Sequence, residues 1–310
     1  MIRNILLALA CCLPFVAADV RGAAPSQPVC GPAAAGVRIV QTVLGGVPVL
    51  IRVPPRVSMP PIVLWHGFGP PDSEAALMSL LPLDDLPAVK VYAGLPLFGR
   101  RAPEDPGELA RRQSEDLVTG VFGPVVMGAV RELPVMVDAL RRAGCMEAGE
   151  GIGLFGFSAG GAAVLLALAE REVPVAAAVV LNASTGLPAS VAAYERATGR
   201  TYAWTPETRA LAERADAIAR AAGIAAGSPG PALLVIHGGR DAMVGAGDAR
   251  ALHDVLAPYY AGERACRLAL DIVDGMAHAP TGDDDAARVR MRAGDWFRRF
   301  LSRSGTDTGC

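Results

Sequence analysis

The amino-acid sequence predicts an α/β fold: a mostly parallel central sheet with helices on both faces and a small cap insertion. Short apolar runs alternate along the chain with longer segments of helical pattern, which is typical of a parallel sheet covered by helices. The runs are apolar at consecutive positions, as in strands buried on both faces. The chain also has 310 residues and is 52% hydrophobic, which is enough to form a large core.

The fold is expected to begin with a β-hairpin. Residues 37–53 alternate roughly between apolar and polar positions around Gly45-Gly46, a pattern typical of two strands joined by a turn. The apolar run at 62–65 then predicts the first strand buried on both faces. Further strands are expected at residues 89–93, 151–157, 175–181, 232–236 and 266–273. Helices are expected at residues 72–81, 124–143, 159–170, 248–256 and 284–301, the second of them kinked at Pro134.

Two segments interrupt this alternation. Residues 94–123 are charged and have the composition of a loop, whereas residues 184–230 lack a strand and carry one helical pattern, at 206–222. We interpret the second segment as a cap inserted over one end of the sheet. One domain is therefore expected to span residues 37–303, followed by a loose tail at 304–310.

The amino terminus has the pattern of a signal peptide. Arg3 is followed by an apolar stretch of secretory length and then by small residues, which predicts cleavage after Ala18 or as late as Ala24. Residues 19–36 are rich in Pro, Ala and Gly and are expected to form a flexible leader. These features predict a secreted or periplasmic protein. Two alternatives remain: lipidation at Cys11 or Cys12, with less support, and a buried amino-terminal helix. No other stretch is expected to be long and apolar enough to span a membrane.

Charge and cysteine content limit the classes of partner. With 29 Lys plus Arg against 31 Asp plus Glu, the formal net charge is −2, which gives no reason to expect nucleic acid as a partner. After removal of a leader, four cysteines would remain, and three pairings of them are open. None has metal-ligand spacing to another Cys or to a His, so no metal site is expected. These four cysteines are Cys30, Cys145, Cys266 and Cys310.

The motif with the clearest chemistry is Gly156-Phe157-Ser158-Ala159-Gly160-Gly161. It matches the pattern G-x-S-x-G and lies between an apolar strand and an Ala-rich helix. A serine on such a tight turn exposes its Oγ, and small neighbours allow the chain to approach itself closely. The amino terminus of the following helix also favours a developing negative charge. We therefore predict that Ser158 is a nucleophile.

A nucleophilic serine needs a base, and the sequence has four histidines. His253 lies in the middle of a predicted helix, where a solvated side chain is expected. His66 and His237 each follow a strand, and structural roles are open for both. His278 follows the last predicted strand in a loop that can carry an imidazole over the edge of the sheet. We predict that His278 is the base.

The base in turn needs a carboxylate that holds its tautomer. Asp241 lies just beyond a strand end, and Gly238-Gly239 permits the turn that would direct it toward the base. Asp271 and Asp274 are closer to His278 in sequence. They rank lower because the first lies inside a strand and the second in the turn after it. A simple turn aspartate is the alternative for Asp241.

An oxyanion needs hydrogen-bond donors. One is expected to be the backbone N–H of Ala159, directly after the nucleophile. The other is expected from His66-Gly67-Phe68-Gly69, which follows the first buried strand, with Phe68 N–H first and Gly69 N–H second. The alternative for the segment at 66–69 is an ordinary glycine turn with no part in the reaction.

These motifs, in the order Ser, Asp, His along the chain, resemble the α/β-hydrolase superfamily over roughly residues 37–301. The pattern looks most like its dienelactone hydrolase-type and small esterase- or peptidase-like members. It departs from the dienelactone hydrolases in having a Ser where those have a Cys nucleophile. The resemblance implies a serine hydrolase without a metal or organic cofactor, and it does not fix a substrate.

The sequence therefore predicts hydrolysis of small carboxylic esters through an acyl-enzyme intermediate. Peptide cleavage or acyl transfer by the same triad is the alternative, and a catalytically silent binding protein on the same scaffold is a third hypothesis. The oligomeric state is left open.

Two further features have open interpretations. Apolar residues of the cap are expected either to line an acyl pocket or to pack the cap on the sheet. Asn182-Ala183-Ser184 matches a glycosylation sequon, to which we give no weight because it adjoins a core strand. The apolar cap residues are Leu187, Val191, Tyr194, Tyr202 and Trp204.

Overall fold

A computed structural model of the protein describes residues 29–30 and 36–301. Its central sheet has eight strands in the order β1-β2-β4-β3-β5-β6-β7-β8. The hairpin β1–β2 is antiparallel and β2 pairs antiparallel with β4, whereas the strands from β4 to β8 are parallel to one another. The strands are β1 (Arg38–Leu44), β2 (Val47–Val53), β3 (Met59–Trp65), β4 (Ala88–Ala93), β5 (Ile152–Phe157), β6 (Val175–Leu181), β7 (Ala232–Gly238) and β8 (Leu268–Val273).

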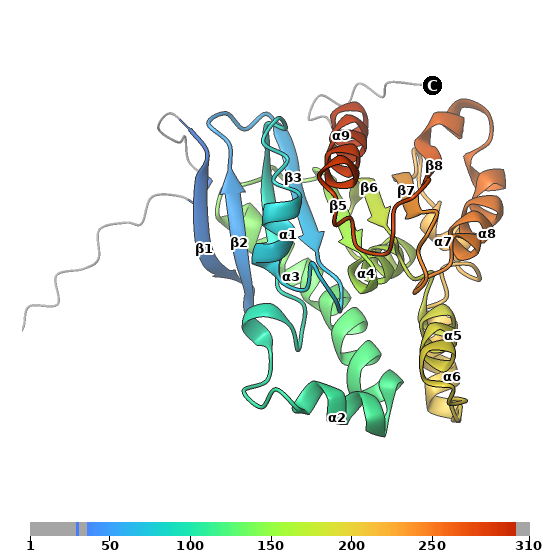
Figure 1. Ribbon diagram of the computed structural model, residues 1–310. Helices are drawn as coiled ribbons and strands as arrows, with labels where there is room; N and C mark the ends of the chain where they lie inside the picture. Colours follow the sequence, from blue (N-terminus) through green and yellow to red (C-terminus); the bar gives the residue numbers. More distant parts are fainter. Residues whose placement is uncertain (1–28, 31–35, 302–310) are drawn as a thin grey trace, which may run out of the picture.

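Helices cover both faces of the sheet (Figure 1), so the predicted fold class is confirmed. Helices α1 (Glu74–Leu80) and α9 (Asp283–Phe300) pack on one face, and their apolar side chains form one core with that face. Helices α3 (Gly128–Arg142), α4 (Ala159–Glu170), α7 (Ala221–Ile224) and α8 (Ala246–Leu256) pack on the other. The strands between them are buried throughout, which explains their continuous apolar runs.

Both interruptions of the alternating pattern contain helices. Residues 94–123, expected to be a loop, form η1 (Gly99–Arg101), α2 (Glu108–Glu115) and the start of the π-helical η2 (Val118–Met127). Helix α2 consists mostly of charged and polar residues, with Leu109 on its apolar side, and ion pairs of Glu108 with Arg111 and Arg112 stabilise it. A π-helix has no sequence signature of its own.

The segment at 184–230 also differs in detail from the expectation. It contains α5 (Leu187–Thr198), which was not expected, and the expected helix at 206–222 is divided into α6 (Pro206–Arg214) and α7. Figure 1 shows α2, α5 and α6 beyond the edge at which the parallel strands end. The segments 94–123 and 184–230 therefore both lie near this edge of the sheet.

One helical stretch in the described part of the chain is long and apolar enough to cross a membrane by length and composition. It is Val118–Arg142, formed by η2 and α3 together, and 67% of its most apolar window is buried inside the protein. The expectation that no segment after the leader has this composition is therefore wrong. Its burial against α4 and the sheet identifies it as a core helix.

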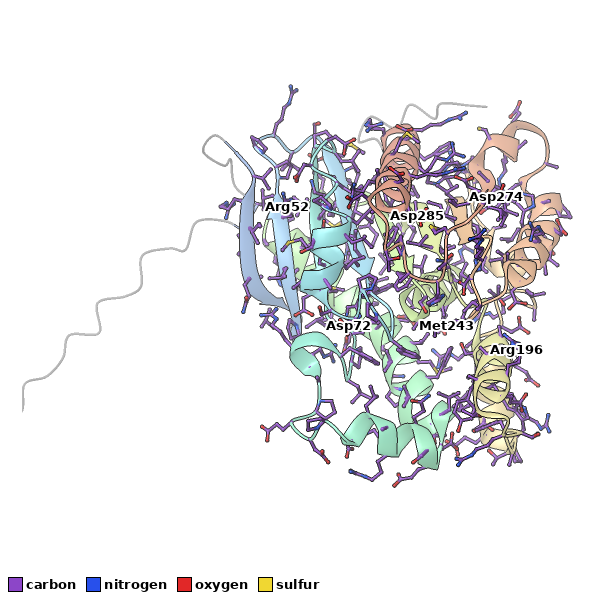
Figure 2. The ribbon with its side chains drawn as sticks, viewed as in Figure 1. Arg52, Asp72, Arg196, Met243, Asp274 and Asp285 are labelled. Carbon is purple, nitrogen blue, oxygen red and sulfur yellow. A yellow bond between two sulfur atoms is a disulfide. The ribbon has the colours of Figure 1, made fainter. Side chains whose placement is uncertain are left out.

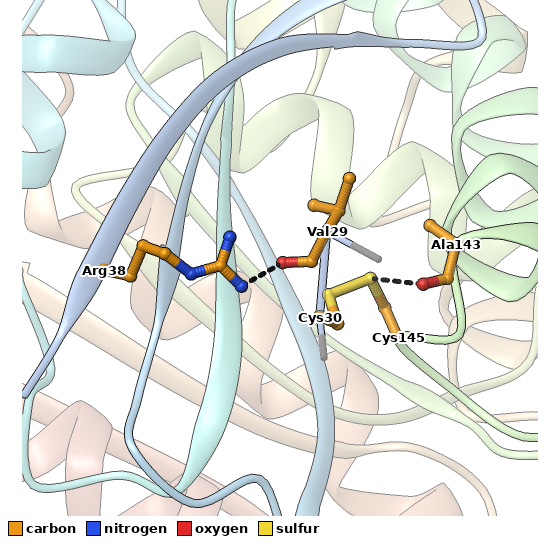
Figure 3. The surroundings of a disulfide bond; sticks show 5 residues. All are labelled: Val29, Cys30, Arg38, Ala143 and Cys145. Carbon is orange, nitrogen blue, oxygen red and sulfur yellow. Dashed lines mark hydrogen bonds between the residues drawn. A yellow bond between two sulfur atoms is a disulfide. The ribbon is translucent and has the colours of Figure 1, made fainter. Parts of the chain in front are cut away.

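A disulfide joins Cys30 to Cys145, with their Cα atoms 5.0 Å apart (Figure 3). It attaches the segment before β1 to the turn after α3, and Arg38 adds a hydrogen bond to the carbonyl oxygen of Val29. This bond belongs to one of the three pairings left open by the sequence and is incompatible with the other two. Cys310 lies outside the described residues, as does the predicted signal peptide at 1–18.

Lys90 is the only lysine in the sequence, and its side chain is fully buried in β4. Its Nζ donates a hydrogen bond to the carbonyl oxygen of Leu86 at 3.1 Å. The ion pair between Arg52 and Asp84 lies nearby (Arg52 is labelled in Figure 2). Burial lowers the pKa of the Lys90 ammonium to about 8. The two charges of the ion pair act on the pKa of Lys90 in opposite directions, Asp84 raising it and Arg52 lowering it.

This buried amine predicts a specific pH dependence of stability. The unfolded chain holds its lysine proton up to a pKa of about 10.4, so between about pH 8 and 10 it binds a proton that the folded protein has lost. The free energy of unfolding is therefore expected to rise by about 1.5 kcal/mol from pH 8 to 9.5 through this group. Urea unfolding of the wild type and of Lys90→Met measures this. The rise should be absent from the variant, and equal slopes in both proteins would contradict the prediction.

Candidate active site

The three predicted triad residues follow three different strands of the sheet. Ser158 follows β5, Asp241 follows β7 and His278 follows β8. These strands are parallel and lie close together in the order β5-β6-β7-β8. Since parallel strands end at the same edge of a sheet, residues 83 and 37 positions apart in sequence come together there.

Ser158 lies on a sharp turn between β5 and α4. Its backbone has φ 52° and ψ −115°, a conformation that residues other than glycine rarely adopt. The glycines of the motif allow this turn because the backbone approaches itself closely. A Cβ on Gly156 would lie 2.2 Å from the carbonyl oxygen of Gly160, and one on Gly160 would lie 2.4 Å from that of His66. Small residues are therefore required at both positions.

Ser158, His278 and Asp241 form one chain of hydrogen bonds. The Nε2 of His278 lies 3.0 Å from Ser158 Oγ, and its Nδ1 lies 2.7 Å from Asp241 Oδ2. An ionised carboxylate can only accept, so Nδ1 carries the proton and Nε2 accepts from the serine hydroxyl. The side chain of His278 is 13% exposed, which leaves the serine end of the chain accessible from solvent. This arrangement can remove a proton from Ser158 as the serine attacks an electrophile.

Asp241 is held as a carboxylate. Burial acts to raise its pKa, but hydrogen bonds from His237, His278 and Val244 N–H outweigh burial and hold the pKa well below its usual range. The backbone N–H groups of Met243 and Val244 both donate to Oδ1 at 2.9 Å, which fixes the carboxylate at the start of its own turn. Oδ2 faces the imidazole of His278 at 2.7 Å, and His237 Nε2 lies 3.4 Å from the same oxygen.

The other predicted acids have different partners. Asp271 lies inside β8 and pairs with Arg288 and Arg292 of α9. Asp274 lies in the turn after β8, beside Gly239. The hydrogen-bonded partner of His278 is Asp241.

The remaining histidines are engaged elsewhere. His66 is buried, its Nδ1 lies 2.8 Å from Gly67 O and its Nε2 accepts from Leu95 N–H, so it joins the loops after β3 and β4. Burial lowers the pKa of His66, which favours this neutral form. His253 lies on α8 and pairs with Asp254 at the surface. His237 is fully buried in β7 and contacts the loop of Asp241.

The candidate oxyanion donors lie beside the nucleophile. Strand β3 pairs with β5 in the register Trp65↔Gly156, which brings the loop after β3 against the serine turn. A Cβ on Gly67 would lie 3.0 Å from Ser158 Cβ. In the part of the chain that the structure describes, the Phe68 N–H has no acceptor, and the Ala159 N–H opens α4 and has none within the helix. Both predicted donors are therefore available to an oxyanion.

A cavity of about 410 Å³ adjoins this loop. Phe68 and Phe98, which both line it, stack with ring centroids 5.1 Å apart, and Leu97 and Leu109 are further apolar lining residues. Asp72 lies at its polar side. Figure 2 shows Asp72, from the loop after β3, and Met243, from the loop after β7, near the same edge of the sheet.

The five expected cap residues divide into a buried group and a partly buried group, and Tyr194 belongs to the second. Leu187 and Val191 are buried and belong to the core on the α4 side of the sheet, so they pack the segment on the domain. Tyr202 and Trp204 are partly buried in edge-to-face contact, and the Tyr202 hydroxyl donates to Asp116 at 2.9 Å. This bond joins the 184–230 segment to the end of α2.

No group of three or more His, Cys, Asp or Glu that could hold a metal ion occurs within the described ranges. Two polar residues that the sequence reading did not assign to the site contact the acid and base loops, namely Asn182 and His237. The only sequence signal for either was its place at a strand end.

Comparison with known proteins supports the fold. No family model matches the sequence, and no curated protein matches it. The solved structure of TT1662 from Thermus thermophilus is 23% identical with a TM-score of 0.63, and the match covers 84% of this chain and 98% of that one.

Two further solved structures are similar. An acylaminoacyl peptidase from Pyrococcus horikoshii is 15% identical with a TM-score of 0.58, over 86% of this chain and 42% of that one. An esterase/lipase from an uncultured bacterium is 18% identical with a TM-score of 0.55, over 88% of this chain and 87% of that one. Together with the sheet order and the serine turn after β5, these matches show that the chain has the α/β-hydrolase fold.

Proposed function

We propose that the protein is a serine hydrolase that cleaves small carboxylic esters. The observation that carries the proposal is the chain of hydrogen bonds from Ser158 through His278 to Asp241. A hydroxyl, an imidazole and an ionised carboxylate in this order activate serine for attack on a carbonyl carbon. The strained turn at Ser158 and the free N–H groups beside it support the same assignment.

In the first half of the proposed reaction, Ser158 Oγ attacks the ester carbonyl while His278 Nε2 accepts the hydroxyl proton. The resulting oxyanion is stabilised by the N–H groups of Phe68 and Ala159. Asp241 stabilises the imidazolium that forms at His278 without taking up the proton. His278 then gives the proton to the leaving alcohol, and the acyl group remains on Ser158.

In the second half, water replaces the alcohol. His278 accepts a proton from water, the hydroxide attacks the acyl carbon, and a second oxyanion forms in the same place. Its collapse breaks the bond to Ser158, which regains its proton from His278, and releases a carboxylic acid. The cycle needs no group beyond these side chains and backbone N–H groups.

Peptide cleavage by the same triad is the second candidate, because one similar structure is an acylaminoacyl peptidase. This chain spans 42% of that peptidase's length. The cavity beside Phe68 offers about 410 Å³, which fits a small acyl or alcohol group. We therefore favour small esters, with acyl transfer as a variant of the same chemistry and a catalytically silent binding protein as a third candidate.

We also propose that the protein works in an oxidising compartment outside the cytoplasm. The disulfide between Cys30 and Cys145 supports this location, since such bonds are rare where thiols are kept reduced. The pattern of a signal peptide in the sequence supports it as well. Secretion and periplasmic location fit the disulfide equally.

The function can be tested by labelling and by substrate choice. A fluorophosphonate is expected to modify Ser158, identified by mass spectrometry of the labelled peptide. Acetyl and butyryl p-nitrophenyl esters are expected to be hydrolysed at least about 100-fold faster than peptide p-nitroanilides. Faster cleavage of the anilides would favour the peptidase. Absence of both labelling and turnover would favour the silent binding protein.

A further inference from the structure

Asn182 lies at the end of β6, between the nucleophile strand and the acid strand, and its side chain is fully buried. Its Oδ1 accepts a hydrogen bond from Gly238 N–H at 2.7 Å. Its Nδ2 donates to the carbonyl oxygens of Ala277 at 3.1 Å and His278 at 2.5 Å. One side chain therefore binds the backbone of the acid loop and the backbone of the base itself.

The orientation of this amide is fixed by its partners. Gly238 offers a donor, and the carbonyl groups of Ala277 and His278 offer acceptors. Exchanging the amide N and O would place a donor against the Gly238 N–H and an acceptor against the two carbonyl oxygens. An aspartate would retain the contact with Gly238 but would direct an acceptor at two carbonyl oxygens. Asparagine is thus the residue type that these three partners need.

The backbone at this position supports the same role. Asn182 has φ 46°, a left-handed conformation that asparagine tolerates better than most residues. Its own N–H donates to Ile236 O, and the preceding carbonyl, of Leu181, accepts the N–H of Ser158. Two consecutive residues at the end of β6 therefore contact all three loops that carry Ser158, Asp241 and His278.

We propose that Asn182 is a positioning residue of the triad: it holds the His278 loop at a fixed distance and angle from the acid loop. This inference rests on the proposed hydrolase function. The imidazole of His278 must satisfy two hydrogen bonds at once, at 3.0 Å to Ser158 and 2.7 Å to Asp241. A backbone shift of about 1 Å at His278 would break one of them, and misplacement of this size can lower a rate about 100-fold.

The test uses Asn182→Gly, which removes the amide but accepts the positive φ, and Asn182→Asp, which keeps the size of the side chain. Each is expected to lower kcat for p-nitrophenyl acetate about 10- to 100-fold, with KM changed less than about threefold. Tyr260→Phe is the matched control. It removes a buried hydrogen bond to Pro231 O, at the start of the same strand β7, and should leave kcat unchanged.

A second measurement does not depend on turnover. The Nδ1 proton of His278, bonded to Asp241, should give a low-field proton resonance that disappears in His278→Gln. We expect this resonance in the wild type and in Tyr260→Phe, and its loss or broadening in the Asn182 variants. If Asn182→Gly does not fold, Asn182→Asp gives the result.

The outcomes separate this inference from the proposed function. A wild type that neither hydrolyses esters nor reacts with a fluorophosphonate contradicts the hydrolase proposal, and the resonance then decides the role of Asn182. An active wild type with folded Asn182 variants that keep kcat within about threefold and keep the resonance overturns the inference alone. Equal losses of kcat in Tyr260→Phe and Asn182→Gly overturn it as well, because they indicate a general effect of destabilisation.

Discussion

Replacing Ser158 with alanine is expected to lower kcat for a short-chain aryl ester on the order of 10⁶-fold. The same loss is expected for His278→Ala and for the double variant. The reason is that the serine hydroxyl and the imidazole act as one unit, joined by the hydrogen bond at 3.0 Å. Once either is removed, the other has nothing to activate. Steady-state kinetics of the two single variants and the double variant measure this.

His253→Ala is the matched control for the histidine variant. His253 lies on α8 in a surface contact with Asp254, so its removal should leave kcat unchanged. Losses that multiply in the double variant would show that Ser158 and His278 act independently. That result would contradict the proposed triad.

Replacing Gly156 with alanine is expected to lower the free energy of unfolding by at least about 3 kcal/mol, or to prevent folding. The added Cβ would lie 2.2 Å from Gly160 O and 2.5 Å from Gly161 N. Both atoms belong to the backbone of the first turn of α4, which cannot move without moving Ser158. Urea unfolding measures the loss of stability, and any folded fraction should have a strongly lowered kcat.

Gly247→Ala is the control for this effect. Gly247 lies in the first turn of α8, is exposed and has nothing within 4 Å of an added Cβ. Its replacement should change the free energy of unfolding by less than about 1 kcal/mol, toward greater stability. A Gly156→Ala protein as stable and active as this control would contradict the close approach at the serine turn.

The sequence was most informative where a feature is local. The strand, turn and helix around Ser158 could be predicted because the small residues of the motif and the apolar run before them lie within a dozen positions. The strands were found because burial on both faces leaves continuous apolar runs. Helix α2 was not predicted because most of its residues are charged or polar, as in a loop, and η2 was not predicted because π-helices have no sequence pattern.

The sequence alone could not distinguish residues that have the same local setting. His237 lies at the end of one strand and His278 follows another, each near a glycine turn, yet His237 is buried and His278 reaches Ser158. Asn182 is the clearest example of a residue that the sequence alone could not identify. Its three partners lie 56, 95 and 96 residues away, so no local pattern identifies it.

The sequence by itself determined the fold class, the position of the nucleophile turn and a short set of candidate acids and bases. Periodicity and turn chemistry act over a few residues, and these features follow from them. Only the tertiary structure decided which carboxylate faces His278, which cysteine pairs with Cys30, and that Asn182 joins the acid and base loops. Those choices depend on the order of parallel strands in the sheet, which brings distant loops to one edge.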